Sequence, residues 1–495
     1  MDIDQIFEQI KSNRDITNWF PDEFYDPFLM KNMTEVVDSI ESHILFNSKI
    51  LIFHDYDVDG ITGGFILYDY LYTKTDTNTM LSNREYGYGL SDTEVDEIIE
   101  KEYDLVITVD CGISEQDMIN KLQENGIEVI VTDHHEGKND LPCLFIDPKV
   151  GKKYPYKELC GAGVAYKLVC SLEGEQVYNY IDLVAFATVA DVVPLVDENR
   201  YLVHKGLDKL NKKPFPPLKA LIDTVGVKDI TSSDIGYQIA PIINSANRMN
   251  YDPTPMKLLK GDNPLANAYS MKDKNEQRKK LVKSAMETIE VDNDKNVIVH
   301  KGDFGRGLTG IIASRVQNKY EKPVFMVNSE NYGSVRSLKP LNAVDSLNKV
   351  SRFLHSHGGH SMAAGFNLKD GCFDIFKSHL EDIAEGLEYK TREVDVVLYD
   401  LSVLTIGLWT KLQKLEPYGN GNPKPYFKVQ GVVLDDYSAT RSGEHLKLEV
   451  DGVEGIWFYF DREINLQKPL DIYFELGYND YSNNIQMIVQ KVEEV

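Results

Sequence analysis

The chain has 495 residues, of which 42% are hydrophobic and 26% are charged, as expected of a globular protein with roughly two to four domains. Its formal net charge of −25 argues against non-specific binding to nucleic acid or anionic membranes, but it leaves room for a local basic channel or bound metal. Five scattered cysteines without a CxxC pair predict neither a disulfide framework nor a zinc finger. The N-terminus lacks a signal-peptide core and no apolar run approaches transmembrane length, so we expect a cytoplasmic protein without a membrane segment.

The first half of the chain predicts an α/β domain. Residues 1–47 read as short helical pieces, with one helix over Met33–Ile44. Apolar β-runs then alternate with helical segments. Strands are predicted at Ile50–His54, Leu105–Val109, Glu128–Thr132 and Leu144–Asp147, and helices from near Gly60 and over Glu115–Glu124, Gly161–Ser171 and Ile181–Ala190. Such alternation indicates a mostly parallel sheet covered on both faces, with ligands beyond the carboxyl ends of its strands.

The second half changes character twice. A long polar helix is predicted over Pro264–Glu290, with Asn263 as its N-cap. A new α/β pattern follows from Asn296, with a helix over Leu308–Tyr320 and strands near Val324–Val327 and Tyr332–Arg336. Past Glu393, alternating aromatic-rich segments separated by turns indicate a small antiparallel barrel or sandwich.

Three aspartates lie at alternate positions directly after the first predicted strand. Asp55, Asp57 and Asp59 would point to one side of an extended backbone, where three carboxylates would crowd together. Like charges that close are costly unless a cation neutralises them. A solvated acidic loop is the alternative interpretation, so these residues alone indicate a metal site without establishing it.

Three further clusters strengthen the metal interpretation. Asp110 and the run Asp133-His134-His135 end two predicted strands, and Asp191 ends an apolar helical run. Each alone could be a cap or a turn residue, but together they indicate one site. Aspartate and histidine ligands without thiolates suit Mn²⁺ or Mg²⁺ better than structural zinc. A pair of ions about 3.5–4 Å apart would support hydrolysis of a phosphate ester or anhydride.

These motifs are similar to those of a known superfamily. DYDVDG (55–60), VDCG (109–112), TDHH (132–135) and ADVVPL (190–195) resemble the successive motifs of the DHH phosphoesterases. The chain most closely resembles the RecJ exonucleases, which are specific for single-stranded DNA. The resemblance extends to NREYGYGL at Asn83–Leu90, PIINSANRM at Pro241–Met249, GSVRS at Gly333–Ser337, GGHSMAAGF at Gly358–Phe366 and LEPYGNGNPKP at Leu415–Pro425.

The resemblance implies an architecture. We expect a parallel-sheet DHH domain and a smaller α/β DHH-associated domain joined by a long helix, with a C-terminal OB-fold-like β-barrel. The corresponding predicted boundaries are an N-terminal helical segment (1–47), the DHH domain (48–255), the connecting helix (256–291), the DHH-associated domain (292–392) and the OB-fold-like domain (393–495).

The resemblance also implies roles for individual residues. By motif, the metal ligands are Asp57, Asp59, Asp110, His134 and Asp191. Asp55 and His135 match adjacent catalytic positions, and His360 would face the scissile phosphate. The implied phosphate and strand contacts are Arg84, Arg248, Ser334, Arg336 and His360. A packed histidine and surface arginines are the alternatives for these positions.

The implied activity is 5′→3′ hydrolysis of single-stranded DNA to mononucleotides in repair or recombination, with two Mn²⁺ ions that Mg²⁺ could replace. We expect a monomer, with a helicase or single-strand-binding protein as a candidate partner. One alternative is a DHH phosphodiesterase of short oligoribonucleotides or cyclic dinucleotides; those relatives typically lack a C-terminal barrel. Another is a catalytically silent replication scaffold, which would have lost metal ligands that this chain retains.

Overall fold

A computed structural model describes the chain except residues 15, 17, 18, 20–23, 88, 138, 139, 390, 391, 442, 461–463, 480 and 481. The chain divides into two compact units. The first combines Met1–Ala240 with Glu393–Val495, and the second comprises Pro241–Arg392. Among the described residues, no helix combines the length and the apolar character needed to cross a membrane.

The first unit contains the predicted parallel sheet. Its strand order is β2-β1-β3-β4-β5, and every neighbouring pair is parallel. The strands are β1 (Ile50–His54), β2 (Thr77–Leu81), β3 (Leu105–Val109), β4 (Glu128–Thr132) and β5 (Leu144–Ile146). Strand β2 was not predicted, because TNTML is polar and the strand lies half-buried at the sheet edge.

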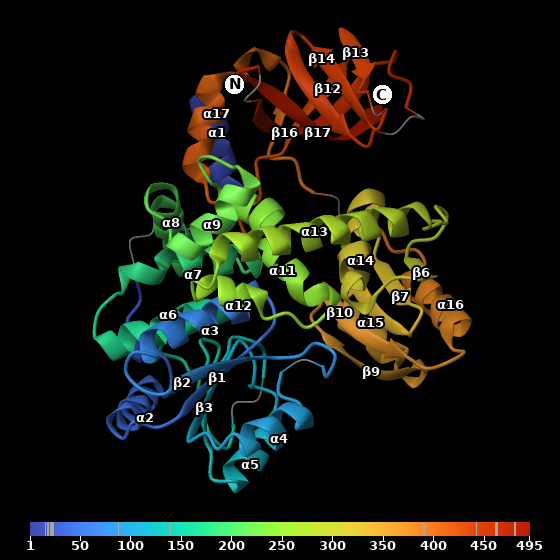
Figure 1. Cartoon of the computed structure of the whole chain (residues 1–495). Coiled ribbons are helices and arrows are strands. Elements are labelled where there is room, and N and C mark those ends of the chain that lie inside the picture. The colour runs from blue at the N-terminus through green and yellow to red at the C-terminus, as the bar shows by residue number, and fades with distance from the viewer. Residues whose placement is uncertain are drawn as a thin grey trace. The chain divides into compact units, whose positions relative to one another are not determined.

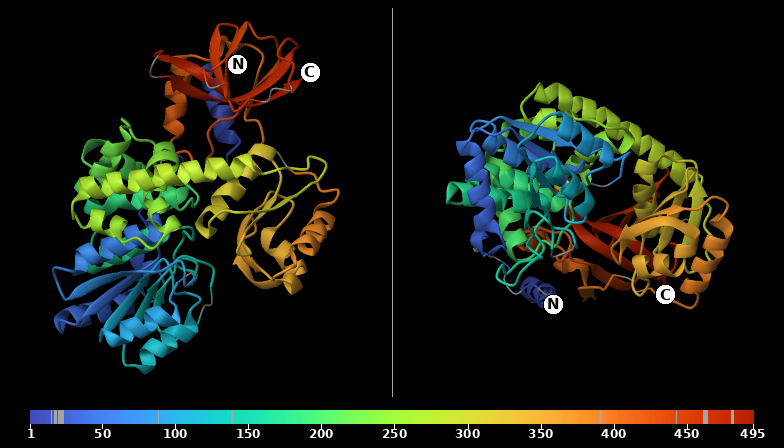
Figure 2. Two further views of the ribbon diagram at one scale, coloured as in Figure 1. Left: turned by 45° about the vertical axis from the view of Figure 1, so that its right-hand side comes forward. Right: turned by 90° about the horizontal axis from the view of Figure 1, so that it is seen from below.

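Helices cover both faces of this sheet, as predicted from apolar β-runs that alternate with helical segments. Helices α4 (Asp92–Glu100) and α5 (Gln116–Glu124) share one apolar core with the sheet. Helices α2 (Met33–Leu45), α3 (Val58–Leu71) and α6 (Gly161–Glu173) pack on the other face (Figure 1). The left view of Figure 2 shows the same arrangement. Beyond them, α7 (Ile181–Ala190) packs along α8 (Asp197–Lys212), and α9 (Pro216–Val225) follows in the chain.

The C-terminal region forms a seven-stranded mixed sheet in the order β11-β12-β16-β17-β15-β14-β13. Its strands are β11 (Val396–Leu398), β12 (Phe427–Val432), β13 (Asp436–Ala439), β14 (His445–Val450), β15 (Val453–Phe458), β16 (Leu470–Asn479) and β17 (Asn484–Glu494). The pairs β11–β12 and β15–β17 are parallel, so the sheet is not purely antiparallel as the sequence pattern suggested.

The N-terminal segment contributes to two cores. Ile6, Phe7 and Ile10 of α1 (Ile3–Ser12) are buried in the core of the C-terminal sheet, together with α17 (Ile406–Leu412). Helix α2 instead packs against α6 and β5. The two ends of the chain are therefore held together by apolar packing that no local sequence pattern reports.

The second unit contains a five-stranded sheet in the order β6-β7-β8-β10-β9. Its strands are β6 (Ile298–Gly302), β7 (Val324–Asn328), β8 (Tyr332–Arg336), β9 (Leu354–Gly359) and β10 (Ala363–Leu368). Helix α14 (Thr309–Tyr320) packs on one face, and α15 (Ala343–Lys349) and α16 (Phe373–Ala384) pack on the other. The predicted long helix is α13 (Pro264–Glu287), which is preceded by α11 (Ala240–Met249) and α12 (Thr254–Leu259).

Candidate metal centre

An aspartate follows directly after four of the five parallel strands of the first sheet. These residues are Asp55 after β1, Asp110 after β3, Asp133 after β4 and Asp147 after β5, and all four are buried. The remaining strand, β2, is followed by Ser82, whose hydroxyl donates to Asp55 Oδ1 at 3.2 Å. The carboxyl ends of parallel strands meet at one edge, so the fold gathers these carboxylates into one row.

The first aspartate cluster is not extended as the alternating pattern suggested. Helix α3 begins at Val58, and Asp57 caps it by accepting from the N–H groups of Asp59 (2.9 Å) and Gly60 (3.3 Å). Asp59 therefore lies in the first turn of a helix, so alternation along a strand does not explain how the three side chains come together. The expectation was wrong because an N-cap residue has extended φ and ψ itself, and the helix follows directly after it.

Asp59 is held by a second helix. Its two carboxylate oxygens accept from the backbone N–H groups of Gly161 (2.6 Å) and Ala162 (2.8 Å), at the start of α6. These N–H groups have no partner within their own helix, and the positive end of the helix favours a carboxylate there. These two bonds fix the Asp59 side chain in a buried position, although burial raises its pKa.

Asp110 has an unusual backbone conformation, with φ of +62°. Aspartate tolerates this left-handed region better than most residues. Gly161 packs against its side chain so closely that a Cβ there would lie 2.6 Å from the Asp110 Cβ. A strained backbone and a required glycine at one carboxylate are typical of a functional site.

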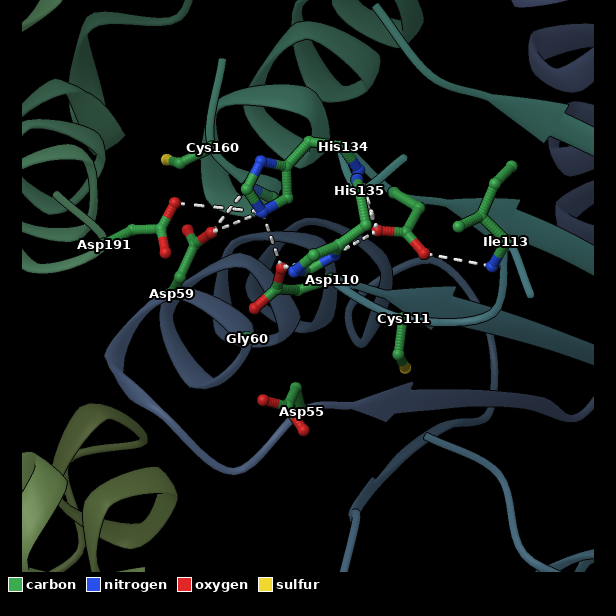
Figure 3. Close-up of polar contacts among 12 residues, drawn as sticks. Asp55, Asp59, Gly60, Asp110, Cys111, Ile113, His134, His135, Cys160 and Asp191 are labelled. Atoms are coloured by element: carbon green, nitrogen blue, oxygen red, sulfur yellow. Dashed lines mark hydrogen bonds and ion pairs between the residues drawn. The ribbon is translucent and has the colours of Figure 1, made fainter. Parts of the chain in front are cut away.

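His134 lies at the centre of the cluster (Figure 3). Its Nε2 is 3.1 Å from Asp110 Oδ1, 3.7 Å from Asp59 Oδ2 and 3.8 Å from Asp191 Oδ2. Among the described residues this buried nitrogen has no hydrogen-bond partner. Burial lowers the pKa of His134 to about 4, which keeps the imidazole neutral, the form that binds a metal.

Asp133 orients the histidine pair, a role that sequence reasoning did not assign. Its Oδ1 accepts from the backbone N–H groups of His134 (2.7 Å) and His135 (3.2 Å), and it lies 2.8 Å from His135 Nδ1. Its Oδ2 accepts from the Ile113 N–H at 3.0 Å. Burial alone would raise the pKa of Asp133, but the hydrogen bond with His135 lowers it below its usual value. The signal that could have found it is its place directly after β4.

The residues of this cluster fit a divalent cation. Three overlapping groups each bring their ligand atoms within 4.8 Å of one another: Asp110, His134 and His135; Asp59, His134 and Asp191; and Asp55, Asp57 and Asp110. The pKa values of Asp55, Asp110 and Asp191 are raised well above the usual value for aspartate, mainly by burial and secondly by neighbouring carboxylates. That cost disappears when a cation binds, and oxygen ligands with imidazole nitrogen suit Mn²⁺ or Mg²⁺.

The structure thus brings together seven residues predicted to form the site: Asp55, Asp57, Asp59, Asp110, His134, His135 and Asp191. Arg84 follows β2 in the same unit, with its guanidinium 5.2 Å from the centre of the Tyr56 ring. The other predicted phosphate contacts belong to the second unit: Arg248, Ser334, Arg336 and His360. Arg336 there donates to Ser314 Oγ at 2.9 Å, and His360 is exposed.

Asp147, which was not assigned a role, predicts a pH effect on stability. It is 1% exposed, and its Oδ2 has no hydrogen-bond partner among the described residues. Burial raises its pKa to about 7, so between pH 4 and 7 the folded protein holds a proton that the unfolded chain has released. The stability that this group contributes is therefore lost as the pH rises through 7.

Asp147→Asn should reduce the loss of unfolding free energy between pH 5 and 7 by roughly 2 kcal/mol in urea titrations. The exposed Asp117→Asn control should leave the pH profile unchanged, and an unchanged profile for Asp147→Asn would contradict the assignment.

Three family models match separate parts of the chain. Family models match at residues 49–188 (DHH family, N-terminal domain), 294–390 (DHHA1 domain) and 394–491 (RecJ OB domain). The single-stranded-DNA-specific exonuclease RecJ of Bacillus subtilis is 34% identical over 457 residues, which are 86% of this chain and 58% of that protein. The RecJ of Thermus thermophilus is 32% identical and covers 94% of this chain, which spans 71% of its length.

Solved structures of RecJ are similar to this chain as well. The crystal structure of Thermus thermophilus RecJ with Mn²⁺ matches with a TM-score of 0.84 and 30% identity, over 94% of this chain and 72% of that one. The same protein with Mg²⁺ matches with a TM-score of 0.77 and 28% identity, over 94% of this chain and 70% of that one. The predicted fold is confirmed: a parallel-sheet α/β domain, a second sheet domain and a C-terminal OB domain. The chain belongs to the RecJ family of DHH proteins.

Proposed function

We propose that the chain is a metal-dependent exonuclease that hydrolyses single-stranded DNA in the 5′→3′ direction to mononucleotides, in DNA repair or recombination. The observation that carries the proposal is the buried set of carboxylates around His134, in a chain of the RecJ family. This chain spans only 58% of the length of its Bacillus subtilis relative, so the activity of that protein is not carried over by similarity alone. The proposal therefore rests on the residues of this chain's own site as well as on the family.

The proposed ligands of the metal are Asp57, Asp59, Asp110, His134 and Asp191. They would hold a pair of Mn²⁺ ions, which Mg²⁺ could replace. Asp110 occurs in two of the three ligand groups, which makes it the proposed bridging carboxylate. When bound, such ions supply Lewis-acid activation of the attacking water and neutralise the charge of the phosphate.

The remaining residues of the centre set geometry and protonation. Asp133 fixes the His135 ring through Nδ1, and this bond raises the pKa of His135 although burial alone would lower it. His135 therefore holds a proton beside the cluster more readily than His134 does. The proposed catalytic roles of Asp55, His135 and His360 are to orient ligands and to contact the phosphate at the bond being cleaved.

Arg84, Arg248, Ser334 and Arg336 are the proposed phosphate and strand contacts. Arg84→Ala should reduce the preference for 5′-phosphorylated over 5′-hydroxyl DNA by roughly 10- to 100-fold, because one charge-assisted contact is worth about 1.5–3 kcal/mol. Mn²⁺ affinity should not change. Arg84→Lys keeps the charge without the planar fork, so its preference for 5′-phosphorylated DNA should lie between those of Arg84→Ala and the unmutated chain. An unchanged preference in kcat/KM would show that Arg84 does not read the 5′ end.

One set of substrates separates the proposal from its alternatives. The protein with Mn²⁺ should release mononucleotides from single-stranded DNA and leave blunt duplex intact. Activity confined to RNA of a few nucleotides or to cyclic dinucleotides would favour the phosphodiesterase. Mn²⁺ binding without hydrolysis of any substrate would favour the scaffold.

The setting of the reaction is also proposed. All five cysteines are free in the structure, as in a reducing compartment such as the cytoplasm. A monomer is expected, and a helicase or single-strand-binding protein is the class of partner that would deliver a single strand.

A further inference from the structure

The turn after Asp191 has a conformation that its next residue disfavours. Asp191 ends α7, where its N–H still donates to the Ala187 carbonyl at 2.9 Å. Val192 follows with φ of +64° and is 65% exposed. A β-branched residue rarely occupies the left-handed region, because its Cβ crowds the backbone. Contacts from elsewhere in the chain must hold this turn.

Those contacts come from residues 419–422, here called the brace loop, which lie between β11 and β12 of the C-terminal sheet. The side-chain amide of Asn420 donates to the Val192 carbonyl at 2.9 Å, across 228 residues of sequence. The Asn420 carbonyl in turn accepts from the Leu195 N–H at 2.8 Å. One residue therefore bonds to Val192 and to Leu195, at two points of the segment that directly follows Asp191.

The brace loop is itself well fixed. Gly419 and Asn422 exchange two backbone hydrogen bonds, of 2.9 and 3.1 Å. The buried Asn422 amide donates to the carbonyls of Leu415 (2.8 Å) and Pro417 (2.9 Å). A Cβ on Gly419 would lie 2.6 Å from Leu195 Cδ1, so the loop sits directly against the 191–196 segment. Asn420 is exposed, and its amide adds nothing to the packed core.

We propose that Asn420 is a positioning residue, which holds Asp191 in the orientation that binds a divalent cation. The C-terminal region thereby supports Asp191, the one proposed ligand that lies after residue 135. Without the side-chain bond from Asn420, Val192 would relax toward an ordinary φ, and the Asp191 carboxylate would turn away from His134, from which it is now 3.8 Å. This inference rests on the proposed function, because it assumes that the centre binds metal.

The test measures metal binding rather than turnover. Mn²⁺ affinity is measured by calorimetry and by electron paramagnetic resonance on the full-length, metal-stripped chain. Asn420→Ala should weaken binding about tenfold, the lower end of the effect of removing a residue that orients a metal ligand. Adding Val192→Gly should restore most of the affinity, because glycine adopts a positive φ without strain. Asn484→Ala, at an exposed asparagine of β17, is the matched control and should bind Mn²⁺ normally.

The outcomes are distinct. Equal affinities for Asn420→Ala and the unmutated chain would overturn the positioning role and leave the metal centre standing. Weakened binding that Val192→Gly does not restore would also overturn it, since it would indicate general loosening of the C-terminal region. Failure of the unmutated chain to bind Mn²⁺ would overturn the metal centre, the proposed function and this inference together.

Discussion

Asp110→Asn is expected to reduce nuclease activity by at least about 10³-fold while leaving the protein folded. Asp110 is the carboxylate shared by two ligand groups, and its Oδ1 is 3.1 Å from His134 Nε2. Asparagine is a better choice than alanine because the residue has φ of +62°, which asparagine tolerates. The amide also removes a buried charge: burial and the carboxylates of Asp59 and Asp57 raise the pKa of Asp110 well above its usual value. The metal-free variant should therefore be at least as stable as the unmutated chain.

Two measurements check this prediction. Initial rates on single-stranded DNA at saturating Mn²⁺ report the activity, and thermal unfolding in EDTA reports the fold. Asp117→Asn, at an exposed aspartate of α5, controls for the loss of one negative charge. Turnover of Asp110→Asn close to that of the control would refute the role of Asp110 as a shared ligand. An unfolded variant would instead give Asp110 a structural role.

Glu198→Ala is expected to destabilise the first unit by about 3–5 kcal/mol, because it leaves a buried lysine without its counter-ion. Lys167 and Glu198 form an ion pair in which both side chains are 0% exposed. The Tyr154 hydroxyl donates to Glu198 Oε2 at 2.5 Å, and the Tyr25 N–H donates to Oε1 at 3.0 Å. Burial raises the pKa of Glu198 and lowers that of Lys167, so neither charge is favourable without the other.

A double-mutant cycle isolates the effect. Lys167→Met combined with Glu198→Leu should cost far less than either change alone, because an apolar pair leaves no unpaired charge. The exposed pair of Lys101 and Glu97 is the control, and Glu97→Ala should cost less than about 1 kcal/mol. Hydrogen exchange of the β3 amides in urea reports on this sheet alone, which matters in a chain of several parts. Additive losses in the cycle would contradict the coupling of the pair.

Much of the first sheet and of its metal centre could be predicted from the sequence. Strands β1, β3 and β4 have the predicted bounds, because each contains three or four consecutive apolar residues (Leu105–Ile107 in β3, for example), which leave little freedom in a sheet that is buried on both faces. Three of the four candidate clusters were predicted for a related reason. A charged residue directly after such a run lies at the edge of the sheet where ligands collect, as Asp55 and Asp110 do.

What could not be predicted depends on backbone geometry and on distant contacts. Alternation did not reveal that Asp57 caps α3, since an extended residue may continue a strand or begin a helix. The positive φ values of Asp110 and Val192 follow from packing that no local pattern encodes. The bond between Asn420 and Val192 spans 228 residues. The burial of α1 in the C-terminal core was missed because its partners are remote in sequence. Strand β2 was missed because it is polar and lies at the edge of the sheet.

In the proposed function, a buried cluster of carboxylates and histidines drives metal-dependent removal of nucleotides from the 5′ end of a single strand. The most direct test uses one single-stranded DNA oligonucleotide, labelled at either its 5′ or its 3′ end and incubated with the metal-stripped protein. On adding Mn²⁺, the 5′ label should be released first, as a mononucleotide, while the 3′ label stays in progressively shorter fragments. EDTA or Asp110→Asn should stop both. Early release of the 3′ label, or cleavage that persists in EDTA, would contradict the proposed function.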